Sequence, residues 1–145
     1  MKNYIIIIKS NLFDLKEYNL ERKVREKAPA FFGKLIRKCK VIGIEDLQNS
    51  LDEAEEKGII NEEEREKAIL TDLIVSGNLK EDRGEKVLLV IEVSYKIDED
   101  DVFRAKERAK IIEKVYKIKT IGVVLGKDIS EKAKNLAEEL AVLLI

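Results

Sequence analysis

The sequence predicts a single α/β domain in which helices flank a mixed β-sheet. Three observations lead to this fold class. The chain has 145 residues, 45% of them hydrophobic, which is enough for one buried core and too little for two. Residues 69–75 and 86–93 form nearly continuous apolar runs, as do strands that are covered on both faces. After them, helical and strand patterns alternate to the end of the sequence, which is typical of layered α/β domains.

The first part of the chain carries mostly helical patterns. Apolar residues at helical spacing predict a helix over residues 12–27, which Pro29 brings to an end. A second, short helix is expected over residues 30–38, followed by a brief strand at residues 41–42. A third helix is expected over residues 45–58, because its apolar positions repeat at helical spacing and it ends on a glycine.

About residues 68–145 show a β-β-α-β-α-β pattern and predict the core, to which about residues 10–67 add a helical N-terminal part. The expected elements are strands at 69–75 and 86–93 joined by a polar turn at 78–84, a helix at 98–117, a strand at 120–125, a helix at 129–140 and a strand at 141–145. The helix at 98–117 has apolar residues in steps of three and four. Strands that alternate with helices imply a mixed sheet with helices packed on its faces.

Composition excludes several kinds of chemistry. The chain contains 28 Lys and Arg and 29 Asp and Glu residues, so its net charge of -1 gives no overall attraction for phosphate backbones. Cys39 is the single cysteine and there is no histidine, which excludes a disulfide framework, a multi-cysteine zinc site and Ser-His or Cys-His catalysis. Hydrolysis by this chain would therefore need a metal ion held by carboxylates.

Composition also predicts where the protein works. The apolar run at residues 5–8 is far too short for a membrane span, and no small-residue cleavage site follows it. We therefore expect a soluble, cytoplasmic protein without a membrane partner. Charged residues make up 39% of the chain and there is one proline, which fits a thermophilic source.

Two acidic residues interrupt the apolar runs. Asp72 and Glu92 each lie in a predicted strand, where a charged side chain is costly to bury unless it is paired or bound to a metal. If the hairpin register places them opposite each other, Ser94 and Lys96 share the face of Glu92 as long as the strand stays extended. Such a set suits Mg²⁺ or Mn²⁺, which activates water for attack on a phosphodiester while a lysine stabilises the developing charge.

These residues also carry a resemblance. Asp72 on one predicted strand is followed by Glu92-Val93-Ser94 on the next, and then by an amphipathic helix. This order resembles the core of the PD-(D/E)XK nuclease superfamily, in which Asp precedes Glu-x-Lys. The chain resembles more closely an uncharacterised, mostly prokaryotic family of that superfamily with a Glu-Val-Ser variant. The matching stretches cover most of the chain and lie at residues 14–21, 26–33, 71–75, 91–94, 101–105 and 108–109.

The resemblance implies a restriction-endonuclease-like fold and a function. It implies Mg²⁺ or Mn²⁺ bound by Asp72 and Glu92, with Glu21 of the first helix as the accessory acid. It also implies action on DNA phosphodiesters, as an endonuclease or an exonuclease. Asp72, Glu92, Ser94 and Lys96 are the expected catalytic residues.

The sequence departs from the motif at the position of its lysine. Ser94 stands there, so Lys96 on the same strand or Lys106 on the following helix would have to replace the lysine in space. Arg104, Lys106 and Arg108 of that helix are the expected phosphate contacts. Without a replacement lysine, the site would bind metal or nucleic acid and cleave poorly.

Two alternatives remain open at this stage. In the first, Asp72 and Glu92 form a structural ion pair with Arg104 or Arg108. Such a pair compensates the buried negative charges without any catalytic role. The chain would then be a catalytically inactive nuclease-fold module for binding or assembly. The second alternative is a homodimer built on an exposed apolar face, near Phe31 and Phe32 or at the terminal strand.

Overall fold

A five-stranded β-sheet forms the centre of the fold, with the strand order β1-β2-β3-β5-β7. The computed structural model describes residues 15–81 and 84–145. The strands are β1 (Ile36–Val41), β2 (Leu73–Leu79), β3 (Lys86–Val93), β5 (Thr120–Leu125) and β7 (Leu143–Leu144). Strands β1, β2 and β3 are antiparallel neighbours, whereas β3, β5 and β7 are parallel. The predicted mixed sheet is therefore confirmed.

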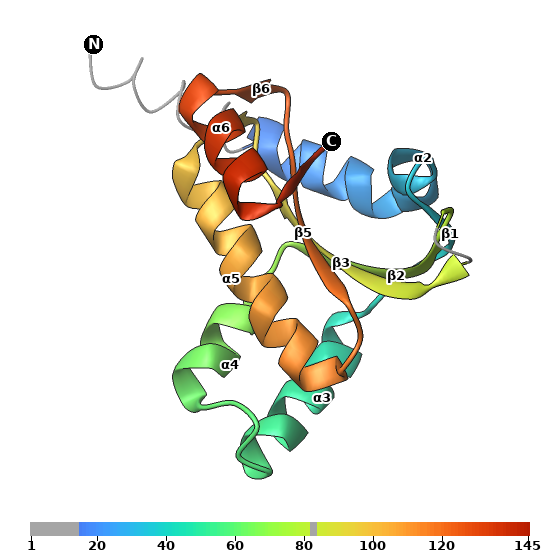
Figure 1. Ribbon diagram of the computed structural model, residues 1–145, viewed down its shortest axis with the longest axis vertical. Helices are drawn as coiled ribbons and strands as arrows, with labels where there is room; N and C mark the ends of the chain where they lie inside the picture. Colours follow the sequence, from blue (N-terminus) through green and yellow to red (C-terminus); the bar gives the residue numbers. More distant parts are fainter. Residues whose placement is uncertain (1–14, 82–83) are drawn as a thin grey trace.

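Helices cover both faces of this sheet (Figure 1). They are a first helix over residues 15–26, α2 (Ala28–Phe32), α3 (Ile44–Glu56), α4 (Glu62–Ile69), α5 (Glu99–Tyr116) and α6 (Glu131–Leu140). Two short parallel strands, β4 (Lys96–Ile97) and β6 (Asp128–Ile129), form a second small sheet. Among the helices of the described residues, none combines the length and the apolar character that a membrane crossing needs.

Strand β3 shows why the apolar runs are continuous. Val87, Leu89 and Ile91 belong to a buried cluster with residues of the first helix and α2. The alternate residues Leu88 and Val90 belong to a second cluster, with residues of α3, α4 and α5. Successive side chains of a strand point to opposite faces, so a strand with helices on both sides needs apolar residues throughout. The expectation of strands covered on both faces is confirmed.

The helix expected over residues 30–38 is wrong beyond Phe32. Helix α2 ends there, and the chain enters β1, in which Ile36 pairs with Leu79 of β2. The apolar spacing in this segment fits a short helix as well as a half-buried strand. Pairing with β2 decides between them, since it buries Ile36 completely at the sheet edge. The same pairing extends β2 to Leu79, beyond the predicted end of that strand at residue 75.

Helix α4 has no counterpart in the predicted pattern. It occupies residues Glu62–Ile69, so the strand expected from residue 69 begins only at Leu73. Asn61 starts this helix with a capping box. The Glu64 N–H donates to Asn61 Oδ1 over 2.8 Å, and the Asn61 N–H donates to Glu64 Oε1 over 3.2 Å. An Asn followed three residues later by Glu is the sequence signal that marks this start.

The remaining elements lie close to their predicted positions. Strands β3 and β5 have the expected bounds, and α5 lies within the range expected for it. Helix α3 begins one residue before its expected range and ends two residues before the end of that range. Asp98 is the N-cap of α5 and accepts from the Asp101 N–H over 2.9 Å. Helix α6 begins two residues later than expected, because Ile129 pairs with Ile97 in the small sheet. The last strand is shorter than residues 141–145.

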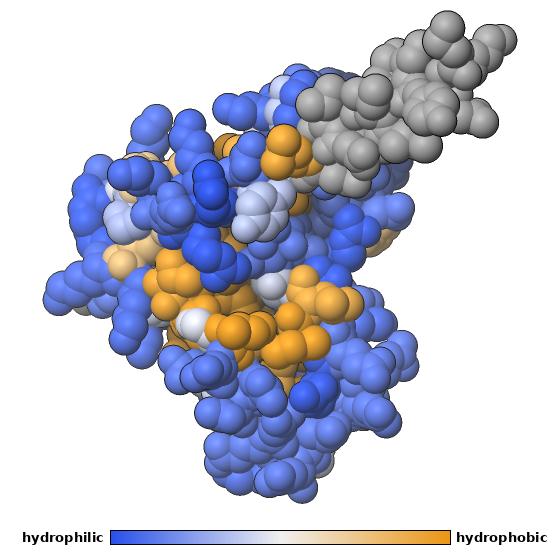
Figure 2. Space-filling view, turned by 180° about the vertical axis from the view of Figure 1, so that it is seen from behind, coloured by the Kyte–Doolittle hydropathy of each residue, from blue (hydrophilic) through white to orange (hydrophobic). Residues whose placement is uncertain are grey.

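Apolar side chains also lie on the outside of the part of the chain that the structure describes. Figure 2 shows hydrophobic side chains gathered in a band above a hydrophilic lower lobe, where α3 and α4 lie in Figure 1. A separate groove is lined by Phe31, Lys34, Leu35, Leu143, Leu144 and Ile145. It joins both places that were considered for a homodimer contact, although Phe32 itself is fully buried. The homodimer stays a prediction.

Candidate functional site

A cleft of about 500 Å³ lies where β2 begins and β3 ends. Its walls come from the first helix, the end of α4, the two strand ends and α5. The lining residues are Glu17, Tyr18, Glu21, Leu70, Asp72, Glu92, Val93, Ser94, Asp101, Arg104 and Arg108. The cleft therefore gathers most of the predicted site residues, from segments that are far apart in the sequence.

Strand pairing holds the two central acids side by side. Leu73 pairs with Ile91, and one step further along this antiparallel ladder Asp72 lies opposite Glu92. The Asp72 N–H donates to Glu92 Oε2 over 3.3 Å, and the Val93 N–H donates to Asp72 Oδ2 over 2.9 Å. The predicted register is therefore confirmed, although Asp72 precedes the first strand residue instead of lying inside the strand.

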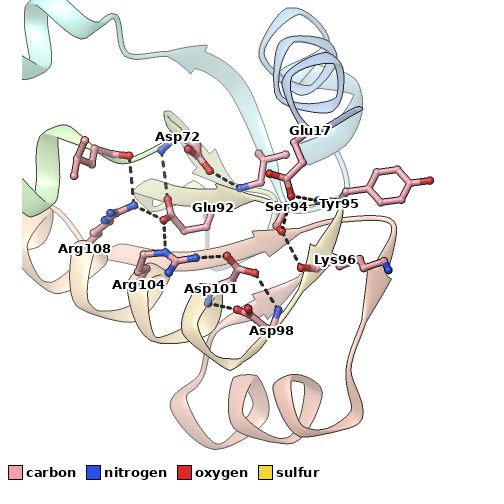
Figure 3. A network of polar contacts seen from close by, with 12 residues as sticks. Glu17, Asp72, Glu92, Ser94, Tyr95, Lys96, Asp98, Asp101, Arg104 and Arg108 are labelled. Carbon is pink, nitrogen blue, oxygen red and sulfur yellow. Dashed lines mark hydrogen bonds and ion pairs between the residues drawn. The ribbon is translucent and has the colours of Figure 1, made fainter. Parts of the chain in front are cut away.

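Two arginines of α5 reach the carboxylate of Glu92 (Figure 3). Arg108 forms an ion pair with Glu92 Oε1 and also donates to the Leu70 carbonyl over 3.4 Å. Arg104, one helical turn earlier, has its Nε 3.6 Å from the same oxygen and pairs with Asp101 through its Nη2. The Glu92 side chain is only 4% exposed. Both of its carboxylate oxygens are thus engaged by groups of this chain.

Negative charge still exceeds positive charge in the cleft. Five carboxylates and two guanidinium groups line it. Burial, followed by the charge of Asp72, raises the pKa of Glu92 to about 7 in spite of the two arginines. Burial also raises the pKa of Asp72, and burial followed by the charge of Asp72 raises the pKa of Glu21. Such shifts are frequent at functional sites.

Two acids of the cleft, Glu17 and Asp101, were not predicted as site residues from the sequence. Glu17 Oε1 accepts from the Ser94 hydroxyl and from the Tyr95 N–H, both over 3.2 Å. The signal for Glu17 was its position four residues before Glu21, which places both acids on one face of the first helix. Asp101 is buried and pairs with Arg104. The feature of the sequence that could have indicated a role for Asp101 is its place three residues after Asp98, as in a capping box at the start of α5.

The two lysines proposed to replace the motif lysine lie outside the cleft. Strand β3 ends at Val93, and Lys96 belongs to the small sheet, where its side chain is exposed and points away from the acids (Figure 3). The expectation that Lys96 shares the face of Glu92 is therefore wrong. Lys106 is on α5 beside Ala105, where the helix backbone packs closely on Gly122 of β5. No lysine is among the described residues that line the cleft.

The acid pair in this arrangement does not fit a divalent metal ion. Within residues 15–81 and 84–145, no group of three or more Asp, Glu, Cys or His side chains is arranged to hold one. Glu21 lies on the cleft but faces Arg25 at 4.0 Å. A cation on Glu92 would meet the guanidinium groups of Arg104 and Arg108, which already occupy its Oε1 side.

The titration of Glu92 predicts a falling contribution to stability as pH rises from about 4.5 to about 7. Its pKa is about 7 in the folded protein, against an ordinary value of 4.5. The folded state therefore binds the proton more tightly in this window, and unfolding becomes easier as the proton leaves. The expected loss is on the order of 3 kcal/mol. Urea unfolding of the wild type and of Glu92→Gln between pH 4.5 and 8 measures it as the difference between the two proteins. A difference that does not change with pH would contradict the prediction.

Comparisons with known proteins add structural likenesses. No protein-family model and no curated protein matches the sequence. A structure of EndoMS in complex with double-stranded DNA matches with a TM-score of 0.47 and 20% identity, over 85% of this chain and 40% of that chain. EndoMS in its apo form matches with a TM-score of 0.45 and 15% identity, over 88% and 44%. A repair endonuclease from Pyrococcus abyssi matches with a TM-score of 0.39 and 24% identity, over 50% and 31%. The chain spans less than half of each of these proteins.

Proposed function

We propose that the chain is a nuclease-fold domain that binds DNA at this cleft without cleaving it. One observation carries the proposal. Asp72 and Glu92 lie side by side at the strand ends, as the nuclease-like motif in the sequence predicts, but Arg108 and Arg104 bind Glu92. The acid pair that the resemblance predicts is thus combined with cations of the same chain.

The surroundings of Ser94 argue against hydrolysis. The resemblance implies a lysine at this position, which would stabilise charge on the reacting phosphate. The Ser94 hydroxyl contacts the carboxylate of Glu17 and the carbonyl of Lys96. A neutral hydroxyl that faces a carboxylate does not supply the positive charge of an ammonium group. The described part of the cleft therefore lacks one component of the cleavage chemistry.

Arg104 is the residue best placed to contact DNA. Its side chain is 44% exposed, whereas that of Arg108 is 11% exposed and held on Glu92. A guanidinium group binds phosphate oxygens through paired hydrogen bonds. Because the whole chain has a net charge of -1, its DNA contacts are expected to be local, and Arg104 is expected to be one of them.

Arg104→Ala is therefore expected to weaken DNA binding several-fold. The salt dependence is expected to fall as well, with the slope of log K against log salt reduced by about 0.9 for one lost phosphate contact. Fluorescence anisotropy of labelled double-stranded and single-stranded DNA, in buffer with EDTA, measures both quantities. Lys110→Ala is the matched control, since Lys110 is an exposed residue of the same helix outside the cleft lining. Equal affinities and slopes for the wild type and Arg104→Ala would exclude the proposed contact.

A metal-dependent nuclease is the second candidate. The observation that favours it is the excess of carboxylates in the cleft, five against two guanidinium groups. The deciding assay is cleavage of linear and circular DNA with Mg²⁺ or Mn²⁺ by the wild type, Asp72→Ala and Glu92→Ala. Cleavage by the wild type that both variants lose would establish a nuclease and replace the first proposal. Linear and circular substrates separate an exonuclease from an endonuclease.

A further inference from the structure

The carboxylate of Glu92 is buried and therefore needs a positively charged or hydrogen-bonding partner. Its side chain is 4% exposed, and a buried carboxylate is retained in a fold only when a positive or hydrogen-bonding partner compensates it. Glu92 Oε2 receives the N–H of Asp72, and its Oε1 faces guanidinium groups. The positive charge comes from α5, and therefore from the chain itself.

Arg108 is held in place more firmly than Arg104. It is largely buried, and its Nη1 donates both to Glu92 and to the Leu70 carbonyl. Arg104 is more exposed, lies farther from Glu92 at 3.6 Å and is shared with Asp101. The cation that belongs to the acid pair is thus Arg108, whereas Arg104 is a second and more accessible charge.

A divalent metal and Arg108 would compete for the same oxygen. Mg²⁺ and Mn²⁺ bind carboxylate oxygens directly, at distances near 2 Å. Coordination by Glu92 Oε1 would bring the metal against the guanidinium of Arg108, and the Leu70 carbonyl helps to keep that group where it is. Like charges in a partly buried site repel strongly.

We propose that Arg108 takes the place of a divalent metal ion at the acid pair, so that the native protein excludes Mg²⁺ and Mn²⁺ from Asp72 and Glu92. This inference deepens the proposed function, since it explains how a nuclease-like core persists without metal. It does not depend on DNA binding, which is measured separately in EDTA. A failure of either proposal is therefore distinguishable from a failure of the other.

Titration with Mn²⁺ alone, followed by electron paramagnetic resonance of the free ion, tests the inference. The wild type is expected to bind no Mn²⁺ at the acid pair. Arg108→Gln is expected to gain one Mn²⁺ per chain, since it keeps the side chain polar but removes its charge. The gain counts as a site when Mn²⁺ binds at least about ten-fold more tightly than the upper limit set by the wild type. The double variant Arg108→Gln/Asp72→Asn is expected to lose the gain. Lys110→Gln, on the same helix outside the cleft lining, is the control and gains nothing.

Two results would overturn the inference. The first is a wild-type protein that binds one Mn²⁺ and loses it in Asp72→Asn, which would mean that Arg108 does not keep the metal out. The second is a folded Arg108→Gln protein, verified by circular dichroism, that gains no Mn²⁺ site. The first result needs no arginine variant, so the inference is testable even where Arg108→Gln does not fold.

Discussion

Arg108→Met is expected to destabilise the protein by about 3–5 kcal/mol at pH 8, the range observed when one partner of a buried ion pair is removed. Methionine keeps most of the length and apolar volume of the arginine stem, so the change removes mainly the charge and its hydrogen bonds. Glu92, with a side chain that is 4% exposed, would then be left with Arg104 at 3.6 Å as its cationic partner. Urea unfolding at pH 8 measures the loss.

The loss is expected to be much smaller at pH 5. The pKa of Glu92 is about 7 with Arg108 in place, and the guanidinium of Arg108 lowers it. Removal of Arg108 raises the pKa of Glu92 further. At pH 5 the Glu92 carboxyl of the folded variant is therefore neutral and does not need a cationic partner. Arg108→Met/Glu92→Gln is expected to recover most of the stability at pH 8. An equal loss at both pH values would show that Arg108 stabilises the fold through packing instead of charge.

Gly126→Ala is the second substitution with a large expected effect. Gly126 follows β5, and a Cβ at this position would overlap the carbonyl oxygen of Ser94 and come within 2.8 Å of Ile97 Cγ1. The Ser94 N–H also donates to the Leu125 carbonyl over 3.0 Å. A backbone oxygen cannot rotate away as a side chain can. The turn after β3 would have to move, at an expected cost of about 3 kcal/mol, the upper end of the range for overpacking.

The control for this substitution is Gly43→Ser. A Cβ at Gly43 has no neighbour within 4 Å, and serine is a favourable residue at the N-cap of α3, which Gly43 occupies. Its stability is expected to stay within about 0.5 kcal/mol of the wild type or to rise. Urea unfolding compares the two variants. A Gly126→Ala protein as stable as the Gly43→Ser protein would show that the Ser94 turn yields without cost.

Local patterns identified the central strands β3 and β5 and the edge strand β7, but at the other edge they missed most of β1. Strands β3 and β5 and helix α5 were predicted because they are strongly apolar or periodic, and these are the segments in which the local pattern is strongest. Residues 36–38 were assigned to a helix although they begin β1. An edge strand forms only when its neighbour is present to pair with it, and Leu79 of β2 lies far away in the sequence.

The sequence by itself pointed to Asp72 and Glu92 as the two acids of the site, and it predicted that they meet if the hairpin register places them opposite each other. Two charges in apolar runs needed a common explanation, and the antiparallel register of β2 and β3 in the structure supplies it. Only the tertiary structure decided which cationic side chains lie next to Asp72 and Glu92. Lys96 was excluded because β3 ends at Val93, and Arg108 was selected because α5 packs across the sheet. Side-chain partners between elements depend on where a helix lies over a sheet, and Ala105 against Gly122 sets that position through a close backbone contact that no local pattern records.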